Sequence, residues 1–445
     1  MPIGSPSESS LDDLLEELEA ALRGRDYRHA EELRTMILSR LAAQKEENDR
    51  IERYVLDLTR DALGPFRGDL DPSRSPISLQ VDLGETDETA RPGSTREGDT
   101  DESPPRDLPL TRGSSPSGDQ VIPVWFGTNR RPIEGGLGFS AERHDRITRG
   151  RVDVLIPEAH RFGEIGTPLW RRLMQRRLRD DHLKVQAIEI EERDRFFAEI
   201  REEMAAVRES GQPPHALFFL HGYNVTFEEA AIRAAQLGCD LSVPGATAFF
   251  SWPSRGSVVA YPADEATIEA SERAITEFLV DFAANCGAEK VDVIAHSMGN
   301  RALLRSLQRI AANAETRGRV RFGQIFLAAP DIDRDLFLDL AELYPEHSER
   351  TTLYASRRDL AVHLSSRVHN APRAGYFTPY TLAPKIDTIA VPNFNVDLLG
   401  HSYFAQAEAL LYDMFDLLRH GESPSLRQRI IPLMAEGRSF WQLRR

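Results

Sequence analysis

A serine between small residues is the first group in this sequence whose surroundings point to chemistry. Ser297 lies in the run Ala295-His296-Ser297-Met298-Gly299, which is the G-x-S-x-G pattern with Ala295 in place of the first glycine. Small flanking residues let the backbone turn sharply between a strand and a helix and lift the serine hydroxyl clear of a sheet. The run therefore predicts a nucleophilic serine, and its alternative is an ordinary turn between a strand and a helix.

A serine hydroxyl is a weak nucleophile unless a base takes its proton. An imidazole that is oriented by a carboxylate does this best near neutral pH. We predict His401 as this base and Asp359 as the carboxylate. Asp331 is the alternative carboxylate, because it follows the predicted strand that comes directly after Ser297 in the chain.

An oxyanion that forms during acyl transfer needs hydrogen-bond donors close to the nucleophile. The turn His-Gly-Tyr-Asn at 221–224 follows an apolar strand upstream of the serine. We predict the main-chain N–H groups of Tyr223 and Met298 as the two donors of an oxyanion hole. Losing one such donor typically costs about 3–4 kcal/mol of transition-state stabilisation. The rings of His221 and His296 are expected to be structural.

Three further side chains are predicted to contact a substrate. Trp252 and Phe404 are placed to line an acyl or alcohol pocket, and Arg255 to bind an anionic group. The alternatives are a place in the core for the aromatic rings and a surface salt bridge for Arg255.

No metal ion or organic cofactor is expected. Asp331, Asp333 and Asp335 imitate part of a calcium loop, but Leu336 stands where such a loop needs a glycine. No cluster of cysteine and histidine has the spacing of a zinc site. The chain has 2 cysteines, which we interpret as small core residues of a protein in a reducing cytoplasm.

Apolar runs and amphipathic stretches alternate along the second part of the chain. The predicted strands cover 121–128, 150–157, 184–192, 216–220, 247–250, 291–294, 324–328, 351–355 and 386–391. The predicted helices cover 193–208, 227–239, 264–284 and 300–310, and a last helix follows His401. Such alternation indicates a parallel sheet with helices on both faces. Ligands of these sheets bind beyond the carboxyl ends of the strands, which is where Ser297, Asp359 and His401 fall.

The first 65 residues predict a helical arm. An apolar stripe of leucines begins after Ser10, and a second helix extends to about Leu63 with a nearly heptad seam. We predict a helical hairpin or coiled coil in 10–63 that forms a homo-oligomer or docks a protein partner. The alternative is a hairpin that packs on the main domain.

Residues 66–120 differ from the rest of the chain in composition. They are rich in Ser, Pro, Gly, Asp and Glu and contain few aromatic residues. Such a segment cannot bury enough apolar surface to offset its chain entropy, so we predict a disordered acidic linker. The residues that follow, 121–445, are predicted to form one domain with a C-terminal helical tail.

Composition limits the kind of protein and its partners. The chain has 445 residues and a formal net charge of −15, which disfavours binding to nucleic acid. We find no signal peptide at the start and no apolar run that could span a bilayer. The expected location is the cytoplasm.

Six short motifs occur together in one order: HGYN, FFSWPSRG, AHSMGN, LAAPDID, LYASRRD and LGHSYF. With these motifs, the stretch from about 121 to about 419 resembles a bacterial subgroup of the α/β-hydrolase superfamily that is usually catalogued as a domain of unknown function. The resemblance implies the α/β-hydrolase fold and a triad of Ser297, Asp359 and His401. It implies no substrate, and the Ala295 variant of the elbow is similar to that of some small bacterial lipases.

The sequence therefore predicts a cytoplasmic serine hydrolase. The expected reaction is cleavage of a small acyl ester, as in carboxylesterases and lipases, through an acyl-enzyme on Ser297. The alternative is a catalytically weak or inactive hydrolase-fold scaffold that recruits a partner through its helical arm.

Overall fold

The structure, a computed structural model, describes most of the second part of the chain. The described residues are 119–135, 138–158, 160, 162, 182–255, 261–356, 362, 365–366, 369–376, 379–391, 404–435 and 437–444, with 21, 29, 32–34 and 36–37 near the start. For 404–408 the backbone alone is described. The predicted arm, apart from these few residues, and the predicted linker, apart from its last two residues 119 and 120, lie outside the described residues.

Strands and helices alternate through the described region, as the sequence predicts. The elements in chain order are β1 (Gln120–Pro132), β2 (Phe139–Ile156), β3 (Lys184–Glu191), α5 (Arg193–Glu209), β4 (His215–Leu220), α6 (Phe227–Asp240), β5 (Thr247–Ser251), α7 (Tyr261–Asn285), β6 (Lys290–His296), α8 (Gly299–Ala312), β7 (Phe322–Ala328), α9 (Arg334–Leu340), α10 (Leu343–His347), β8 (Ser348–Ala355), β9 (Ile386–Ala390), α12 (Phe404–His420), β10 (Ile430–Ala435) and β11 (Arg438–Leu443).

The described strands form one sheet of eleven, in the order β10-β11-β9-β8-β7-β6-β4-β5-β1-β2-β3. The neighbouring pairs from β1 through β5, β4, β6, β7, β8 and β9 to β11 are parallel. Only the outer pairs β1–β2, β2–β3 and β10–β11 are antiparallel. Because β4 lies next to β6, with Leu220 opposite Ala295, the turns that follow these two strands meet at one edge of the sheet.

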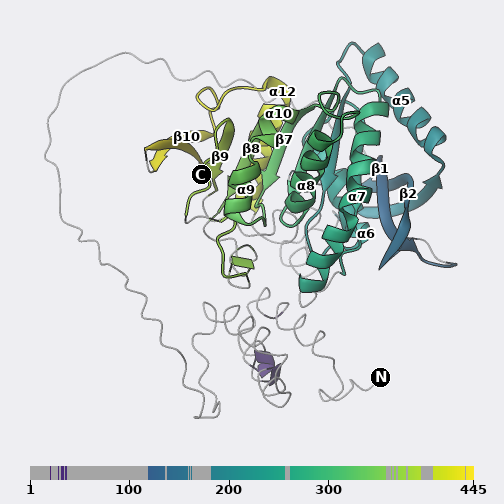
Figure 1. The fold of residues 1–445 in the computed structure, drawn as a ribbon. Helices are drawn as coiled ribbons and strands as arrows, with labels where there is room; N and C mark the ends of the chain where they lie inside the picture. Colours follow the sequence, from purple (N-terminus) through teal and green to yellow (C-terminus); the bar gives the residue numbers. More distant parts are fainter. Residues whose placement is uncertain are drawn as a thin grey trace, which may run out of the picture.

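Helices cover both faces of the central strands (Figure 1). One apolar core lies under α5, α7, α8, α9 and α10, and includes Phe218, Leu220 and Val293. The other lies under α6 and α12, and includes Phe219 and Ile294. Burial on both sides explains why these strands are continuous apolar runs. The predicted α/β architecture, a mostly parallel sheet with helices, is confirmed.

The helix α6 starts shortly after the turn at 221–224, and its start is fixed by a capping box. The hydroxyl of Thr226 accepts a hydrogen bond from the N–H of Glu229 at 3.2 Å, and the Glu229 carboxylate accepts one from the N–H of Thr226 at 2.8 Å. Reciprocal bonds of this kind satisfy two N–H groups that a helix start leaves without partners. The cap therefore holds the chain just beyond the predicted oxyanion turn.

The C-terminal end of the chain differs from the prediction. After α12 the chain does not stay helical but forms the hairpin of β10 and β11, and β11 joins the sheet beside β9. The predicted helical tail corresponds to α12, and the hairpin that follows this helix was not predicted. Proline at 432 stands in β10, an edge strand, where a missing N–H is tolerated.

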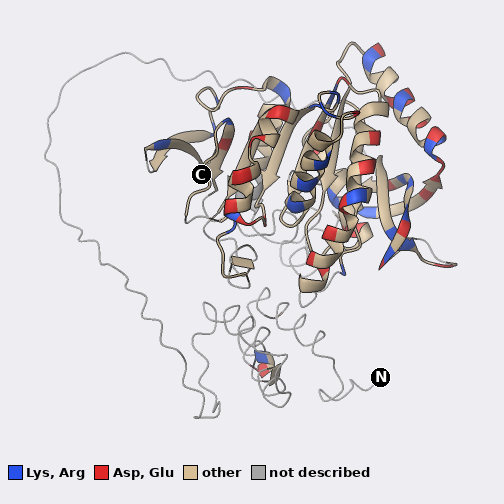
Figure 2. Ribbon diagram, in the orientation of Figure 1, with Lys and Arg blue, Asp and Glu red and all other residues tan. Residues whose placement is uncertain are grey.

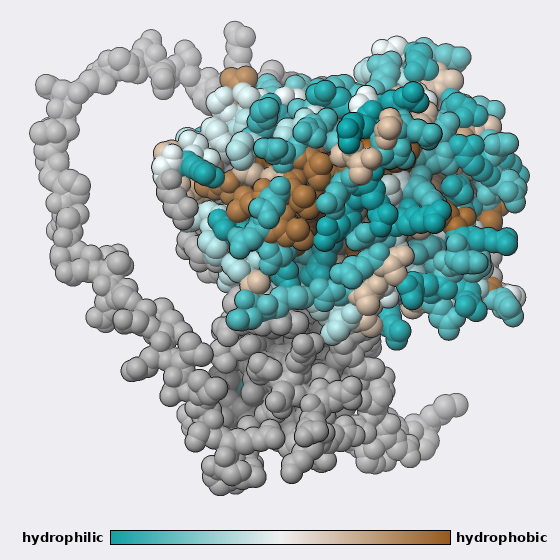
Figure 3. Space-filling model, in the orientation of Figure 1, coloured by the Kyte–Doolittle hydropathy of each residue, from teal (hydrophilic) through white to brown (hydrophobic). Residues whose placement is uncertain are grey.

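Charged and apolar residues are segregated as the layers require. In Figure 2, acidic and basic residues are interspersed on the outer sides of α5, α7 and α8, while the central strands carry few of them. Figure 3 shows an apolar patch near the middle of the same face, around α9, with hydrophilic surface about it. None of the helices in the described part of the chain combines the length and the apolar character that crossing a bilayer requires.

Candidate active site

Ser297 lies in a sharp turn between β6 and α8. The strand ends at His296 and the helix begins at Gly299, so Ser297 and Met298 make the whole turn. Ser297 has a φ of 50°, in the left-handed region that costs a residue with a side chain about 1–2 kcal/mol. Its N–H donates to the carbonyl oxygen of Ala328 at 2.9 Å. A strained serine between a strand and a helix is the geometry of a nucleophile elbow.

The side chain of Asn300 fastens this turn from inside the protein. Its Nδ2 donates to the carbonyl oxygens of Ala295, Ser297 and Ala328, at 3.0, 3.1 and 3.3 Å. Asn300 is completely buried. These bonds connect the end of β6, the turn and the end of β7. The sequence places Asn300 three residues after the serine, but no local pattern predicts that its side chain reaches two strand ends.

Two glycines let the turn after β4 press against the elbow. A Cβ built on Gly222 would lie 3.0 Å from the Cβ of Ser297 and 3.0 Å from Nδ1 of His296. A Cβ on Gly299 would lie 2.6 Å from the carbonyl oxygen of His221. Real Cβ atoms do not approach a carbonyl oxygen as closely as 2.6 Å, so position 299 requires glycine, whereas a side chain at position 222 would force its neighbours to shift by a few tenths of an ångström. The 221–224 turn therefore lies directly beside the predicted nucleophile.

The predicted oxyanion donors belong to the residue after Ser297 and to the turn that packs against it. Met298 precedes α8, so its N–H belongs to the helix start, where such groups have no acceptor within the helix and the dipole favours negative charge. Within the described residues, the Met298 N–H donates to no main-chain carbonyl oxygen of a turn, loop or helix cap. Tyr223 follows Gly222 in the adjacent turn, and Asn224 has a φ of 57°. The oxyanion hole remains a prediction that this arrangement accommodates.

His221 and Trp252 form a buried stacked pair. Their ring centroids are 5.1 Å apart with an interplanar angle of 11°, and the Trp252 Nε1–H donates to the carbonyl oxygen of His221 at 3.0 Å. Trp252 is fully buried. The burial of Trp252 favours the alternative of a place in the core, where the indole holds the start of the 221–224 turn.

Burial keeps His221 and His296 neutral. Loss of hydration lowers the pKa of His221 to about 3, with a further contribution from the charge of Arg130. Loss of hydration also lowers the pKa of His296 to about 3, with Arg233 as the second cause. Both ring nitrogens of His296 are buried, and neither has a hydrogen-bond partner among the residues that the structure describes. A base with so low a pKa accepts protons poorly near pH 7, which agrees with the structural role predicted for both rings.

Asp331 lies beside the elbow, and its carboxylate is fully engaged. Its Oδ2 accepts from the Tyr261 hydroxyl at 2.5 Å and lies 3.2 Å from Nη2 of Arg301. Its Oδ1 accepts from the Ser365 hydroxyl at 2.5 Å and lies 3.5 Å from Nε of Arg373. The residue is 2% exposed. It does not cap α9, because Asp333 does so instead.

The same group of side chains extends to a histidine at the edge of the site. His369 Nε2 lies 2.9 and 3.1 Å from the two carboxylate oxygens of Glu265, which also pairs with Arg301. The bond to His369 and the contact with Arg301 hold the pKa of Glu265 at about 2. The ring of Tyr261 packs edge-on against the rings of both Tyr223 and His369. Through Tyr261, this network connects Tyr223 of the 221–224 turn to Asp331 in the loop after β7.

Other predicted site residues cannot be placed to the same degree. Asp359 and His401 lie outside the described residues, so their predicted roles stay predictions. Phe404 opens α12, but its side chain is not described. Arg255 is exposed, and its main-chain N–H donates to Oδ1 of Asp264 at 2.9 Å. Binding of an anion by Arg255 also stays a prediction.

One cluster outside the elbow has the donor types of a metal site, which the sequence spacing did not reveal. Atoms of His160, Cys239 and Asp240 lie within 4.8 Å of one another near the end of α6. The His160 Nε2 lies 2.8 Å from Oδ1 of Asp240, a hydrogen-bond distance. Burial raises the pKa of the Cys239 thiol to about 11, so the thiol keeps its proton. These contacts are those of a histidine–carboxylate pair beside a protonated thiol.

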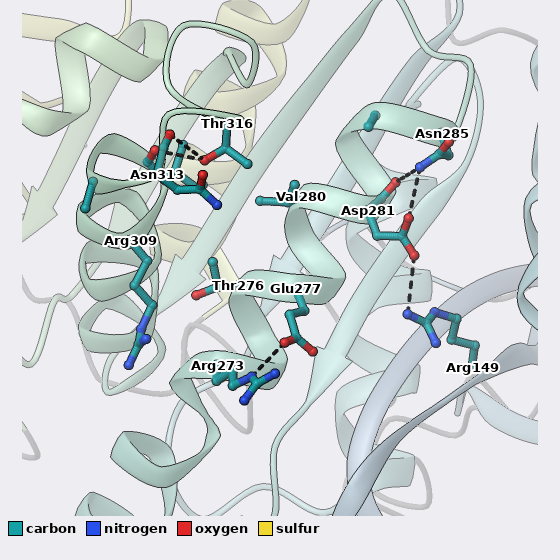
Figure 4. A pocket seen from close by; sticks show the side chains of 13 residues that line it. Arg149, Arg273, Thr276, Glu277, Val280, Asp281, Asn285, Arg309, Asn313 and Thr316 are labelled. Atoms are coloured by element: carbon teal, nitrogen blue, oxygen red, sulfur yellow. Dashed lines mark hydrogen bonds and ion pairs between the residues drawn. The ribbon is translucent and has the colours of Figure 1, made fainter.

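A groove of about 960 Å³ lies along α7 and α8 (Figure 4). Asp281 of α7 and Arg309 near the end of α8 line the groove. Nη2 of Arg149 lies 3.3 Å from Oδ2 of Asp281. Arg309 follows Gly299 by ten positions, which places it about 15 Å along the helix axis from the elbow. The groove is therefore separate from the site at Ser297.

Residues 198–419 match a family model described as "Alpha/beta hydrolase of unknown function (DUF900)". This match covers the 221–224 turn, Ser297, Asp331 and the positions of Asp359 and His401. None of the curated proteins matches the chain.

Several solved hydrolases are distantly similar in structure. The carboxylesterase CesB from Bacillus subtilis is 12% identical, with a TM-score of 0.27, over 48% of this chain and 86% of its own. The esterase of Pyrobaculum calidifontis is 11% identical, with a TM-score of 0.30, over 68% and 84%. A CIB-like hydrolase from Thermoplasma acidophilum is 15% identical, with a TM-score of 0.29, over 47% and 87%. At this distance no substrate can be transferred from them.

Proposed function

The chain belongs, through residues 198–419, to the family of α/β hydrolases of unknown function, and from this premise we propose that it is a serine hydrolase that cleaves carboxylic esters. The observation that carries the proposal is the geometry of Ser297. It lies at a φ of 50° between β6 and α8, with Gly222 packed against its Cβ. A nucleophile elbow needs a serine in such a strained conformation, whereas an ordinary turn between a strand and a helix does not.

The proposed reaction has two halves. In the first, His401 takes the proton of the Ser297 hydroxyl, the oxygen attacks the ester carbonyl, and the protonated imidazole gives that proton to the departing alcohol. In the second, His401 takes a proton from water, the hydroxide attacks the acyl-enzyme, and the proton returns to the Ser297 oxygen as the acid leaves. The N–H groups of Met298 and Tyr223 would stabilise the oxyanion of both tetrahedral intermediates.

The contacts of Asp331 support Asp359 as the triad acid. A carboxylate has about four acceptor positions, and Asp331 already faces Tyr261, Ser365, Arg301 and Arg373. Orienting an imidazole would require it to give up one of these partners. Asp359, which follows β8 by four positions in the sequence, is therefore the proposed acid.

A fluorophosphonate probe tests the proposed nucleophile. The full-length protein should be labelled covalently, and Ser297→Ala should not be labelled. Ser306→Ala is the matched control and should be labelled like the natural protein. Ser306 is a fully buried serine of α8, and its hydroxyl lies 2.9 Å from that of Thr276. Absence of labelling in the natural protein, or equal labelling of the Ser297→Ala variant, would refute the proposal.

Substrate assays test the bond type. We expect p-nitrophenyl esters to be hydrolysed, and thioesters and anilides with the same acyl group to react more slowly. A series of acyl-chain lengths would then measure the depth of the acyl pocket. Faster turnover of anilides than of esters would contradict the assignment to ester hydrolysis while leaving Ser297 as the nucleophile.

A further inference from the structure

The turn that carries the proposed oxyanion donor Tyr223 is held by buried polar groups from outside it. The N–H of Asn224 donates to Oδ2 of Asp264 at 3.3 Å, and the N–H of Val225 donates to the hydroxyl of Ser254 at 3.2 Å. Asn224 adopts a φ of 57°, which a residue with a side chain rarely keeps without support. The two N–H groups that follow Tyr223 therefore donate to buried side chains, Asp264 and Ser254.

Asp264 gathers three donors at the start of α7. Besides the Asn224 N–H, it accepts from the Ser254 hydroxyl at 2.5 Å and from the N–H of Arg255 at 2.9 Å. Asp264 is completely buried. It lies in the first turn of α7, where the helix dipole favours a carboxylate. Loss of hydration raises the pKa of Asp264, while these hydrogen bonds and the charge of Arg130 oppose the rise.

Arg130, near the end of β1, fastens the same segments by their oxygen atoms. Its Nη2 donates to the carbonyl oxygen of Val225 at 2.7 Å, and its Nη1 to that of Ser254 at 3.0 Å. Its Nε donates to the hydroxyl of Ser251 at 2.8 Å. Arg130 is 1% exposed. Burial lowers the pKa of Arg130 to about 10, so the guanidinium keeps its charge at neutral pH.

We infer that three side chains, those of Asp264, Ser254 and Arg130, are positioning residues. They hold the 221–224 turn and the adjoining Val225 so that the Tyr223 N–H faces the oxyanion. The inference rests on the proposed function of Ser297, because the turn has a catalytic meaning only if an oxyanion forms there. None of the three needs to touch the substrate. They act by fixing a donor whose displacement by about 1 Å costs on the order of 100-fold in rate.

The arrangement explains why these side chains are buried together. A buried carboxylate and a buried guanidinium cost free energy unless both are fully hydrogen-bonded. Here the bonds go mainly to main-chain groups of two loops, those after β4 and after β5, and not to each other. The pair therefore joins β1, the two loops and α7 at one point beside the elbow.

Asp264→Asn is the first variant that tests the inference. An amide keeps the shape of the carboxylate but presents an NH2 group to a donor N–H, so one of the three bonds must be lost. We expect kcat for a p-nitrophenyl ester to fall about 100-fold, with KM within about twofold of the natural value. The matched control is Asp281→Asn on the same helix, which removes a carboxylate paired with Arg149 and Arg193 (Figure 4 shows the first of these). This control should keep its kcat.

Hydrogen–deuterium exchange measures the turn itself, independently of chemistry. In Asp264→Asn, amides of the segment 221–226 should exchange at least about tenfold faster, because exchange reports local opening. In Asp281→Asn they should exchange at the natural rate. Unchanged exchange of this segment in Asp264→Asn would overturn the inference, whatever the activity shows.

Ser254→Ala keeps the test usable if Asp264→Asn does not fold. It removes one hydroxyl that bridges Asp264 and the Val225 N–H, and it should lower kcat and increase exchange of the same segment. Combined with Asp264→Asn, it should add little further loss, because both act through one unit. Independent, additive losses would refute a common positioning role.

The two proposals can fail separately. If the natural protein hydrolyses esters and labels at Ser297, but Asp264→Asn keeps its kcat, the positioning role is wrong and the hydrolase stands. If the natural protein neither labels nor turns over any ester, the proposed function is wrong, and with it the catalytic meaning of the turn.

Discussion

The main-chain N–H of Asp331 donates a hydrogen bond to the carbonyl oxygen of Ser297 at 3.1 Å. The loop after β7 is thus fastened directly to the elbow. The carboxylate of the same residue points into a network of Tyr261, Ser365 and Arg301. Asp331 therefore supports the nucleophile through its backbone and occupies its side chain elsewhere.

This arrangement predicts different effects for the two candidate acids. Asp331→Asn should destabilise the fold by about 3 kcal/mol, because buried cations lose their counter-charge, and should lower kcat only modestly. Asp359→Asn should leave stability nearly unchanged and lower kcat by about 10³–10⁴-fold. Thermal unfolding and ester kinetics of both variants check this. A larger loss of kcat in Asp331→Asn would transfer the triad role to that residue.

The contact between Gly222 and Ser297 predicts a second effect. Gly222→Ala would place a Cβ 3.0 Å from that of Ser297, so the turn must move away and kcat should fall about 100-fold. Gly318→Ala is the control. Gly318 has a φ of 74° and open space around it, so this variant should lose about 1 kcal/mol of stability and keep its kcat. Equal kcat values for the two variants would show that the close contact does not matter for catalysis.

Two buried neutral histidines predict how stability depends on pH. Burial lowers the pKa of His221 and of His296 to about 3, whereas an unfolded chain binds a proton to each near pH 6.5. Their stabilising effect is therefore complete above pH 6.5 and is lost as the pH falls from 6.5 toward 3, by up to about 1.4 kcal/mol per pH unit for each ring.

Urea unfolding at pH 7.5, 6.5 and 5.5 measures this slope. His296→Gln should reduce it by the share of one ring, because glutamine does not titrate. His420→Gln, at an exposed position at the end of α12, should leave it unchanged. A slope that His296→Gln does not alter would mean that His296 binds protons equally in the folded and the unfolded protein, which would contradict the lowered pKa.

A buried ion pair fixes α12 to the segment before β10. The Nε of Arg427 donates to Oδ1 of Asp413 at 3.0 Å, and both residues are almost completely buried. Arg427→Ala leaves a buried carboxylate without its cation, so we expect a loss of about 3–5 kcal/mol in the free energy of unfolding. Arg429→Ala breaks a 3.6 Å contact with Asp416 at the surface and should cost less than about 1 kcal/mol. Chemical denaturation of both variants compares them, and similar losses would contradict the assigned weight of the buried pair.

Much of the fold was predictable because its signals are local. The apolar run ending at Ala295, the small residues around Ser297 and the helical spacing after Gly299 together predicted β6, the elbow and α8 correctly. The alternation of strands and helices predicted the parallel sheet. The hairpin of β10 and β11 was missed, because a short edge strand that contains Pro432 has no strong pattern of its own.

The sequence by itself determined which residues could react and in what order they follow one another, since strand, turn and helix patterns depend on neighbours in the chain. The tertiary structure alone decided which side chains are free to act. It placed Trp252 in the core and engaged both carboxylate oxygens of Asp331. It also brought Arg130 and Asp264 to the 221–224 turn and the adjoining Val225, to which both side chains are hydrogen-bonded. These outcomes depend on hydrogen bonds between residues up to 124 positions apart in the numbering, Arg130 to Ser254. Burial and competition for hydrogen-bond partners arise only when such segments pack together.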